Sequence, residues 1–538
     1  MRHGINLSKT LASSMADVSD PNSESVHLSD SSCSTKTFLG GGEFGSGEQA
    51  IDGAGQLSLR HVLPTSRFFA GNNIQFSSVA DAAATASEGD LVVYRIGEMD
   101  PSKVVAQAMA RGAAGILTEQ VLPCPLPQCI VADIDSAMAH VTAATMDHPD
   151  RKLLTIGVLG SAGKTTTSLL ISNLFRSCGL RSAYLTDLGE SDGIVQTTST
   201  DTVQSGAPLV EWISTAADSR CKAAIIEIND DDARHGHYDA IEFDLIVVTG
   251  PASCKGDFGP SSLQCILERL SNDGVVISSA DDTQSMDTIR DSQARSVTYG
   301  VRKHADLSAK IIEQSGGMTT LMVTYQNTTA LMETSLCGSA MAANHAAAIL
   351  TGLLIAQPLE EILEKVSQLR VIPGRGQRLG EFGQATVVLD AGGSPERVSD
   401  CLRTQKSMKA GGRLWCVLAI DGDDSPETLA QYGNLMERFA DNPVVTSTSS
   451  SKPKFLSGSH AILDGVEKCA AFRLVADRKR AIEWTISEAR PEDTIVVITS
   501  ERQNTAHQQR VDLNQITKWI ENARAELTAE RPTLKVVG

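Results

Sequence analysis

The stretch that decides the fold runs from position 154 to position 167 and reads Leu154-Thr-Ile-Gly-Val-Leu-Gly-Ser-Ala-Gly-Lys-Thr-Thr-Thr167. Its first part is an apolar, β-rich run that is typical of a buried strand. A glycine-rich turn follows, and Ser168 to Cys178 then reads as a helical stretch. The sequence therefore predicts a strand, a tight turn and a helix in direct succession.

This turn has the composition of a phosphate-binding loop. The residues that we expect to contact a nucleotide are Gly160, Ser161, Ala162, Gly163, Lys164, Thr165 and Thr166. Glycines let backbone N–H groups converge on phosphate oxygens, and the helix N-terminus adds a favourable dipole. Lys164 would reach the β- and γ-phosphates, and Thr165 would place its hydroxyl on Mg²⁺. The motif is the shorter form G-x-x-G-K-T, because Val158 stands where the longer pattern has glycine. The alternative is an ordinary glycine-rich turn with a chance lysine.

Composition limits the classes of function. The chain has 538 residues, which predicts three or four domains, and a formal charge of −18. Such a charge argues against nucleic acid as a partner. The longest apolar stretch, Ala346 to Ala356, is too short to span a bilayer and fits a buried helix, so we expect no membrane insertion. Eleven scattered cysteines without a C-x-x-C motif predict neither disulfides nor a structural zinc site, and favour the cytoplasm.

The chain divides into four parts by pattern. Residues 1–55 are rich in Ser, Asp and Gly, and we predict a disordered tail. Residues 56–150, 151–370 and 371–538 each alternate apolar strands with helical stretches, which predicts three α/β domains. The phosphate loop belongs to the middle one, which we expect to be built on a parallel sheet.

A short phosphate loop between two other α/β units resembles the Mur ligase family, and within it the MurE type. The similarity runs from about Gly89 to Val497. Further segments match the family in order, namely Thr197-Thr198, Glu227, 243–249, 280–282, 298–300, Gly338 to Asn344, 371–375, Asp390, 414–418, 422–423 and 477–478. The resemblance implies a three-domain architecture with a UDP-binding first domain, a central ATPase domain and a Rossmann-like C-terminal domain for the amino acid.

The resemblance also implies a reaction. ATP would phosphorylate a carboxylate of a UDP-linked muramoyl peptide in peptidoglycan precursor synthesis, and the amine of an amino acid would displace the phosphate. The implied roles are Lys164 and Glu227 in catalysis, Thr165 and Glu227 on Mg²⁺, Thr197 and Thr198 near the muramoyl substrate, Asn344 at adenine, and Arg375 and Asp390 closing the nucleotide site. We expect a monomer that uses ATP and Mg²⁺.

Several family motifs are altered. The departures are Ala162 for Asn, the segment 249–257 for the D-H-L-D metal loop, Arg269 near the lysine that the family carbamylates, His235 and His237 for Gln and Arg, 390–395 without its histidine, 448–451 for D-N-P-R, and 500–504 for G-K-G-H-E. Arginine cannot supply a carbamate. A second interpretation therefore stays open, in which the protein binds nucleotide in a regulatory or scaffolding role without ligation. A third, weaker one is a folylpolyglutamate-synthetase-like ligase.

Other clusters have weaker chemical meaning. His235 and His237 could ligate a metal, but no third ligand is evident, so a solvated loop is the better interpretation. Asp230 to Asp232 could hold Mg²⁺ beside Glu227, or could simply begin a helix. Asp421 to Asp424 lacks the remaining ligands of a calcium loop. Cys254 beside Lys255 has no histidine base placed by the sequence.

Overall fold

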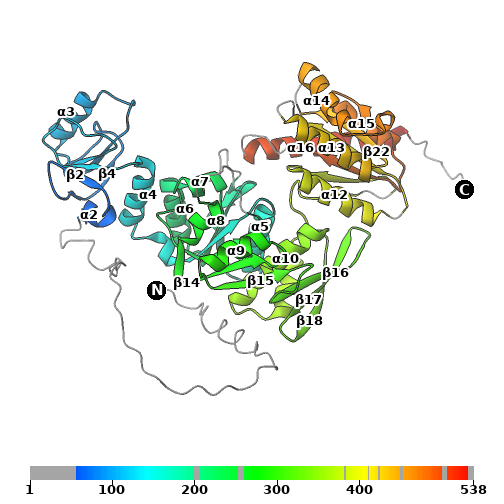
Figure 1. Ribbon diagram of the computed structural model, residues 1–538, viewed down its shortest axis with the longest axis horizontal. Helices are drawn as coiled ribbons and strands as arrows, with labels where there is room; N and C mark the ends of the chain where they lie inside the picture. Colours follow the sequence, from blue (N-terminus) through cyan, green and yellow to red (C-terminus); the bar gives the residue numbers. More distant parts are fainter. Residues whose placement is uncertain are drawn as a thin grey trace, which may run out of the picture.

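A computed structural model describes residues 56–197, 205–251, 260–380, 383–409, 411–421, 424–448, 452–499 and 506–530. The predicted tail of residues 1–55 lies outside these ranges. Three α/β units follow one another along the chain, each built around its own main sheet (Figure 1). The predicted α/β fold class is confirmed.

The first unit has a small sheet in the order β2-β7-β6-β5-β4, in which only β2 runs antiparallel to its neighbour among the described residues. Its elements are β1 (Leu57–Ser58), α2 (Leu59–Val62), β2 (Arg67–Phe69), β3 (Gln75–Phe76), β4 (Val79–Ala80), β5 (Leu91–Tyr94), α3 (Pro101–Arg111), β6 (Gly115–Thr118), β7 (Gln128–Ile130) and α4 (Ile134–Thr145). Helix α4 packs on this sheet with Val141 and on the central unit with Ala139 and Ala143.

The central sheet has the order β11-β10-β9-β12-β8-β13-β14-β15-β16-β17-β18 over the described residues. Its elements are η1 (Pro149–Lys152), β8 (Leu154–Leu159), α5 (Lys164–Ser177), β9 (Ser182–Thr186), β10 (Gly189–Ser191), β11 (Gln196–Thr197), α6 (Gly206–Asp218), β12 (Ala223–Glu227), α7 (Asp230–Arg234), β13 (Phe243–Val248), α8 (Ser262–Leu267), β14 (Leu270–Ser279), α9 (Thr283–Asp291), β15 (Ser296–Gly300), β16 (Leu307–Ser315), β17 (Met318–Tyr325), β18 (Thr328–Thr334), α10 (Ser339–Leu354) and α11 (Leu359–Val366).

The middle of this sheet is parallel, from β9 through β12, β8, β13, β14 and β15 to β16, and antiparallel hairpins extend it at both sides. The carboxyl ends of parallel strands lie at the same edge of a sheet. The loops that follow β8, β9, β12 and β13 therefore meet there, where open α/β sheets bind ligands.

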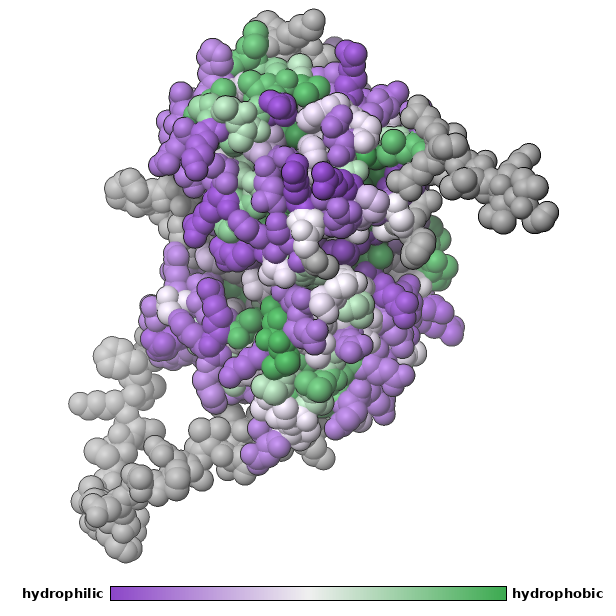
Figure 2. Space-filling view, turned by 90° about the vertical axis from the view of Figure 1, so that its right-hand side faces the viewer, coloured by the Kyte–Doolittle hydropathy of each residue, from purple (hydrophilic) through white to green (hydrophobic). Residues whose placement is uncertain are grey.

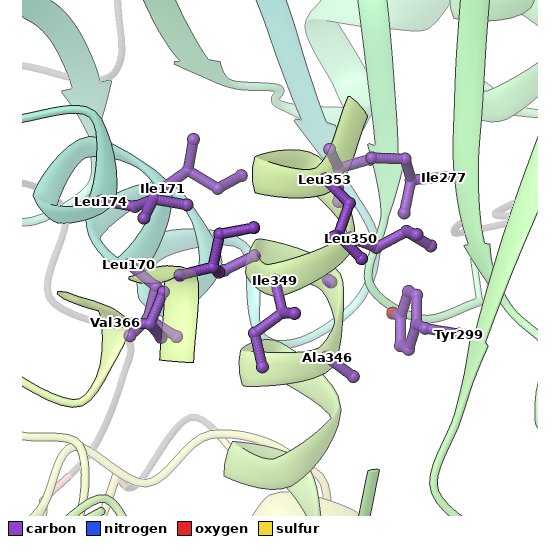
Figure 3. Close-up of a cluster of buried hydrophobic side chains, with 14 of the residues drawn as sticks. Leu170, Ile171, Leu174, Ile277, Tyr299, Ala346, Ile349, Leu350, Leu353 and Val366 are labelled. Atoms are coloured by element: carbon purple, nitrogen blue, oxygen red, sulfur yellow. The ribbon is translucent and has the colours of Figure 1, made fainter. Parts of the chain in front are cut away.

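Helices α5 and α10 are fixed against the sheet by an apolar core (Figure 3). Leu170, Ile171 and Leu174 of α5 face Ile349 and other apolar residues of α10. The side chains of Leu170, Ile171, Leu174 and Ile349 are fully buried. Burial of each Leu or Ile stabilises the fold by about 1.5–3 kcal/mol. The apolar stretch beginning at Ala346 is thus a core helix, as predicted, and it ties α10 to the helix that follows the phosphate loop.

The C-terminal unit has the sheet order β19-β20-β24-β21-β22-β23 over the described residues. Its elements are β19 (Gln377–Leu379), β20 (Thr386–Asp390), α12 (Pro395–Met408), β21 (Leu414–Ile420), α13 (Pro426–Phe439), β22 (Asn442–Ser447), α14 (Lys452–Asp464), η2 (Cys469–Ala471), β23 (Arg473–Leu474), α15 (Arg478–Glu488), β24 (Thr494–Ile498) and α16 (Ala506–Glu530). In the described part of the chain, no helix combines the length and the apolar character needed to cross a bilayer.

A polar contact joins the C-terminal unit to the central one. The Asp400 carboxylate on α12 accepts hydrogen bonds from the Ser339 hydroxyl (3.0 Å) and the Ala340 backbone N–H (3.2 Å) at the start of α10. A carboxylate in this place satisfies free N–H groups and complements the helix dipole.

Seen from the side of the C-terminal unit, the surface mixes hydrophilic and hydrophobic patches (Figure 2).

The buried His345 of α10 makes the stability of the central unit sensitive to acid. Its Nδ1 lies 2.7 Å from the Met341 carbonyl oxygen and its Nε2 lies 3.2 Å from the Thr334 hydroxyl. Burial lowers the pKa of His345 to about 4. The folded state thus binds fewer protons than the unfolded state, whose histidine has a pKa of about 6.5. The free energy of unfolding therefore keeps the full contribution of neutral His345 above pH 6.5 and loses it as the pH falls toward 4.

We therefore expect His345→Gln to flatten the acid side of the stability profile. The wild-type protein should lose up to about 3 kcal/mol more than the variant between pH 7 and pH 4. Urea unfolding across this range measures the difference. The exposed His304→Gln serves as a control that should follow the wild type. Parallel profiles for wild type and His345→Gln would contradict this account of His345.

Candidate active site

Two glycines shape the turn between β8 and α5. Gly160 has φ 138° and Gly163 has φ 86°, both in the region that side chains rarely adopt. A Cβ at Gly160 would lie 2.7 Å from the Gly250 nitrogen, and a Cβ at Gly163 would lie 2.5 Å from Asn344 Oδ1. The loop is therefore packed so closely against its neighbours that only glycine fits at these positions.

The exit of β13 braces the same turn. The Thr249 hydroxyl donates a hydrogen bond to the Ala162 carbonyl oxygen (2.7 Å), and the Ser161 backbone N–H donates to the Pro251 carbonyl oxygen (3.1 Å). These bonds fix the loop on the side that faces β13. The free N–H groups of the first turn of α5 form a helix terminus of the kind that favours anions.

Thr165 and Glu227 meet at the start of α5. The Thr165 hydroxyl lies 2.9 Å and 3.1 Å from the two carboxylate oxygens of Glu227, the last residue of β12. Thr165 is 4% exposed and Glu227 is 2% exposed. Lys164 begins the helix beside them. The structure thus brings Lys164, Thr165 and Glu227 together, while their roles in catalysis and metal binding stay predictions.

Asp187 belongs to this cluster, although the sequence analysis did not single it out. It follows β9, and its backbone N–H donates a hydrogen bond to Glu227 Oε2 (3.1 Å). Burial and then the Asp187 charge raise the pKa of Glu227 to about 8, against smaller lowering effects of Lys164 and the two hydrogen bonds. The only signal in the sequence was an acidic residue directly after the short stretch Ser182 to Thr186, because the pairing of β9 with β12 appears only in the structure.

The donor set fits a magnesium ion. A hydroxyl and a carboxylate are the oxygen ligands that Mg²⁺ prefers, and a phosphate oxygen would complete the bridge to a nucleotide. A neutral, protonated Glu227 avoids the cost of a buried charge. A cation would restore the carboxylate form, because its charge compensates the burial.

Asn344 lies against the phosphate loop from the other side. It is 5% exposed on α10, and its Oδ1 is the atom nearest to a Cβ built at Gly163. The core of Figure 3 holds α10 and α5 together and thereby fixes this approach. The contact with adenine that the resemblance implies for Asn344 stays a prediction.

Arg375 and Asp390 lie together at the entry to the C-terminal unit. The Asp390 carboxylate accepts hydrogen bonds from the backbone N–H groups of Gly376 (2.9 Å) and Gly392 (3.0 Å). Arg375 is 9% exposed in the turn that precedes Gly376. Asp390 therefore fixes the connection between the two units, and closure over the nucleotide stays a prediction for both residues.

Of the two threonines predicted near the substrate, Thr197 lies within the described residues and Thr198 does not. Thr197 ends β11, and its hydroxyl donates a hydrogen bond to Glu190 on β10 (3.2 Å). It is exposed on the hairpin that extends the sheet beyond β9. Thr198 lies outside the described residues, and so do Cys254 and Lys255.

The alignment of Arg269 with the metal-bridging lysine is wrong. The Arg269 carbonyl oxygen accepts from the backbone N–H of Phe243, the first residue of β13. The phosphate loop lies at the opposite end of that strand, so Arg269 is at the wrong edge of the sheet. Helix α8 reaches the site side instead, where the Ser262 hydroxyl donates to Asp230. No lysine occurs in α8.

The other acidic and histidine residues have local partners. Asp231 pairs with Arg234, and Asp232 lies 3.5 Å from His237. His235 Nδ1 lies 2.7 Å from the Asp231 carbonyl oxygen. Within the described ranges, no three His, Cys, Asp or Glu side chains gather as a metal site. The interpretation of 235–237 as a solvated loop stays a prediction.

Comparison with known proteins matches two parts of the chain to family models. Residues 262–352 match the Mur ligase middle domain, and residues 374–501 match the Mur ligase glutamate ligase domain. A Bacillus cereus protein named UDP-N-acetylmuramoyl-L-alanyl-D-glutamate–2,6-diaminopimelate ligase is 25% identical over 445 residues, which cover 79% of this chain and 89% of the relative. A Thermosynechococcus vestitus protein of the same name is 27% identical over 72% of this chain and 81% of its own.

The chain contains the middle and glutamate ligase domains of the Mur ligase family. Solved structures agree on the fold. A structure of UDP-N-acetylmuramoyl-L-alanyl-D-glutamate–2,6-diaminopimelate ligase superposes with a TM-score of 0.62 at 17% identity, covering 87% of this chain and 99% of that one. A MurF ligase from Thermotoga maritima in complex with ADP gives 0.58 at 16% identity, with 84% and 98% covered.

The packing of the loop predicts that alanine substitutions at two glycines with similar φ will affect ATP binding differently. Gly163→Ala places a methyl group on Asn344, whereas Gly179→Ala, at φ 73°, meets no atom within 4 Å. Both variants should lose about 1–2 kcal/mol through the left-handed backbone. Only Gly163→Ala should also weaken ATP binding, by at least about 10-fold, because its loop must shift away from the phosphates.

Calorimetric titration with ATP and Mg²⁺, together with thermal unfolding, measures both effects. Equal ATP affinity in the two glycine variants would show that the turn beside Asn344 is not where the phosphates bind.

Proposed function

We propose that this protein is an ATP-dependent ligase of the MurE type, which adds an amino acid to a UDP-N-acetylmuramoyl peptide in the cytoplasmic synthesis of peptidoglycan precursors. The observation that carries the proposal is the buried Thr165–Glu227 pair at the start of the helix that begins with Lys164. The names of the curated relatives supply the substrate class.

The reaction needs phosphorylation because an amine does not displace oxide from a carboxylate at a useful rate. The carboxylate oxygen of the acceptor attacks the γ-phosphorus of ATP, and the bond to the β,γ-bridging oxygen breaks to release ADP. The amine nitrogen then attacks the carbonyl carbon of the acyl phosphate. The carbon–oxygen bond breaks, inorganic phosphate leaves, and the amine loses a proton.

The residues of the site would act mainly by positioning and charge. The Lys164 ammonium would neutralise the transferring phosphoryl group, and the N–H groups of the turn would orient the β-phosphate. Thr165 and Glu227 would hold Mg²⁺, which when bound neutralises phosphate charge. The two threonines at 197–198 would lie on the muramoyl side, and the C-terminal unit would bring the amino acid.

A second candidate is nucleotide binding without ligation. It is favoured by the segment 390–395, which reads Asp390-Ala-Gly-Gly-Ser-Pro395 and lacks the histidine of the family motif. In this chain Asp390 binds the N–H groups of Gly376 and Gly392, a role that needs no catalysis.

Release of phosphate from ATP decides between these candidates. We expect release with Mg²⁺ only when both a UDP-muramoyl dipeptide and an accepted amino acid are present, and the panel of amino acids identifies the one that is added. Glu227→Gln should lower the rate by about 10²–10³, as for loss of one preorganised charge-stabilising group. ATP binding without any turnover that depends on the acceptor would contradict ligation and support the second candidate.

A further inference from the structure

Asp187 stands out in the site because its position is fixed while its carboxylate is not. Its backbone N–H is bound to Glu227 Oε2 at 3.1 Å. The residue is exposed, and among the described residues none donates a hydrogen bond to its carboxylate. The side chain thus starts within one hydrogen bond of Glu227 and is free to turn toward a ligand there.

Asp187 also carries charge into the site. Glu227 lies beneath it, buried at the end of β12, and strands β9 and β12 are parallel neighbours that end at the same edge. The Asp187 backbone, the Glu227 carboxyl group and the Thr165 hydroxyl meet next to the N-terminus of α5. One carboxylate leaves a divalent cation with a net charge of +1, and a second neutralises it.

The other acidic residues near this edge are engaged elsewhere. Asp230 accepts the hydrogen bond of Ser262, Asp231 pairs with Arg234, and Asp232 lies beside His237. Of the acidic residues that follow β9 and β12, Asp187 is the one whose backbone already touches Glu227.

We propose that Asp187 holds the nucleotide-bound Mg²⁺ together with Thr165 and Glu227. The inference rests on the proposed function, because it assumes that a nucleotide and its cation bind at this loop. It assigns to the residue after β9 a metal-binding role that the sequence motifs did not indicate.

The test measures the cation directly, with Mn²⁺ in place of Mg²⁺. Electron paramagnetic resonance gives the affinity of Mn²⁺ for the full chain loaded with ADP. We expect Asp187→Asn to weaken Mn²⁺ binding by about 10-fold. The same variant should bind ADP in EDTA at least as tightly as the wild type, because it removes a negative charge that repels phosphate. Asp218→Asn changes an exposed aspartate at the end of α6, just before the start of β12 and so at the opposite edge of the sheet, and should alter neither affinity.

If Asp187 is a metal ligand, Asp187→Asn weakens Mn²⁺ binding but does not weaken ADP binding in EDTA. A general distortion of the site by Asp187→Asn would weaken ADP binding in EDTA as well, and that result would overturn the proposal. Mn²⁺ affinity within about twofold of the wild type would overturn it too. Either failure concerns Asp187 alone if the wild type binds ADP, whereas a wild type that binds no ADP under any condition would also refute the proposed function.

Discussion

The hydrogen bonds between the Thr165 hydroxyl and the buried Glu227 carboxyl group are the contact on which the site depends. They join the first turn of α5 to the end of β12, and through Asp187 they reach the end of β9. A carboxylate at such a place is costly without compensation, which is why burial raises the pKa of Glu227 to about 8. The arrangement becomes favourable when a cation is bound. The local energetics thus leave Glu227 protonated without a cation, and the cation that the proposed chemistry uses would stabilise its carboxylate form.

The rest of the central unit keeps this contact in place. Apolar packing of α5 against α10 sets the distance between the phosphate loop and Asn344, and the absence of a Cβ at Gly163 allows the approach. Thr249 holds the loop from the β13 side. The start of α10 is in turn capped by Asp400 of the C-terminal unit. A movement of that unit would therefore act on the helix that carries Asn344.

The sequence predicted the parts of the site that are local in the chain. A strand, a glycine turn and a helix within fourteen residues place Lys164 and Thr165 without knowledge of the tertiary fold. Glu227 could be predicted only from the resemblance to the family, because the sequence alone does not distinguish one acidic residue at the end of a strand from another. Asp187 was missed for the same reason, since its importance comes from the adjacency of β9 and β12. The alignment of Arg269 with the family's lysine was wrong because the length of the connection between β13 and α8 could not be inferred from the sequence. The structure shows that α8 has already ended before Arg269, which lies beside the start of β13.

Transfer of a labelled oxygen tests the central claim most directly, namely that this loop delivers the γ-phosphoryl group to a carboxylate. The acceptor peptide is prepared with ¹⁸O in its terminal carboxylate and incubated with ATP, Mg²⁺ and the accepted amino acid. If an acyl phosphate forms, each molecule of released phosphate carries one ¹⁸O atom from the acceptor. Phosphate without the label would show that ATP is hydrolysed by water in this site, and would contradict the account.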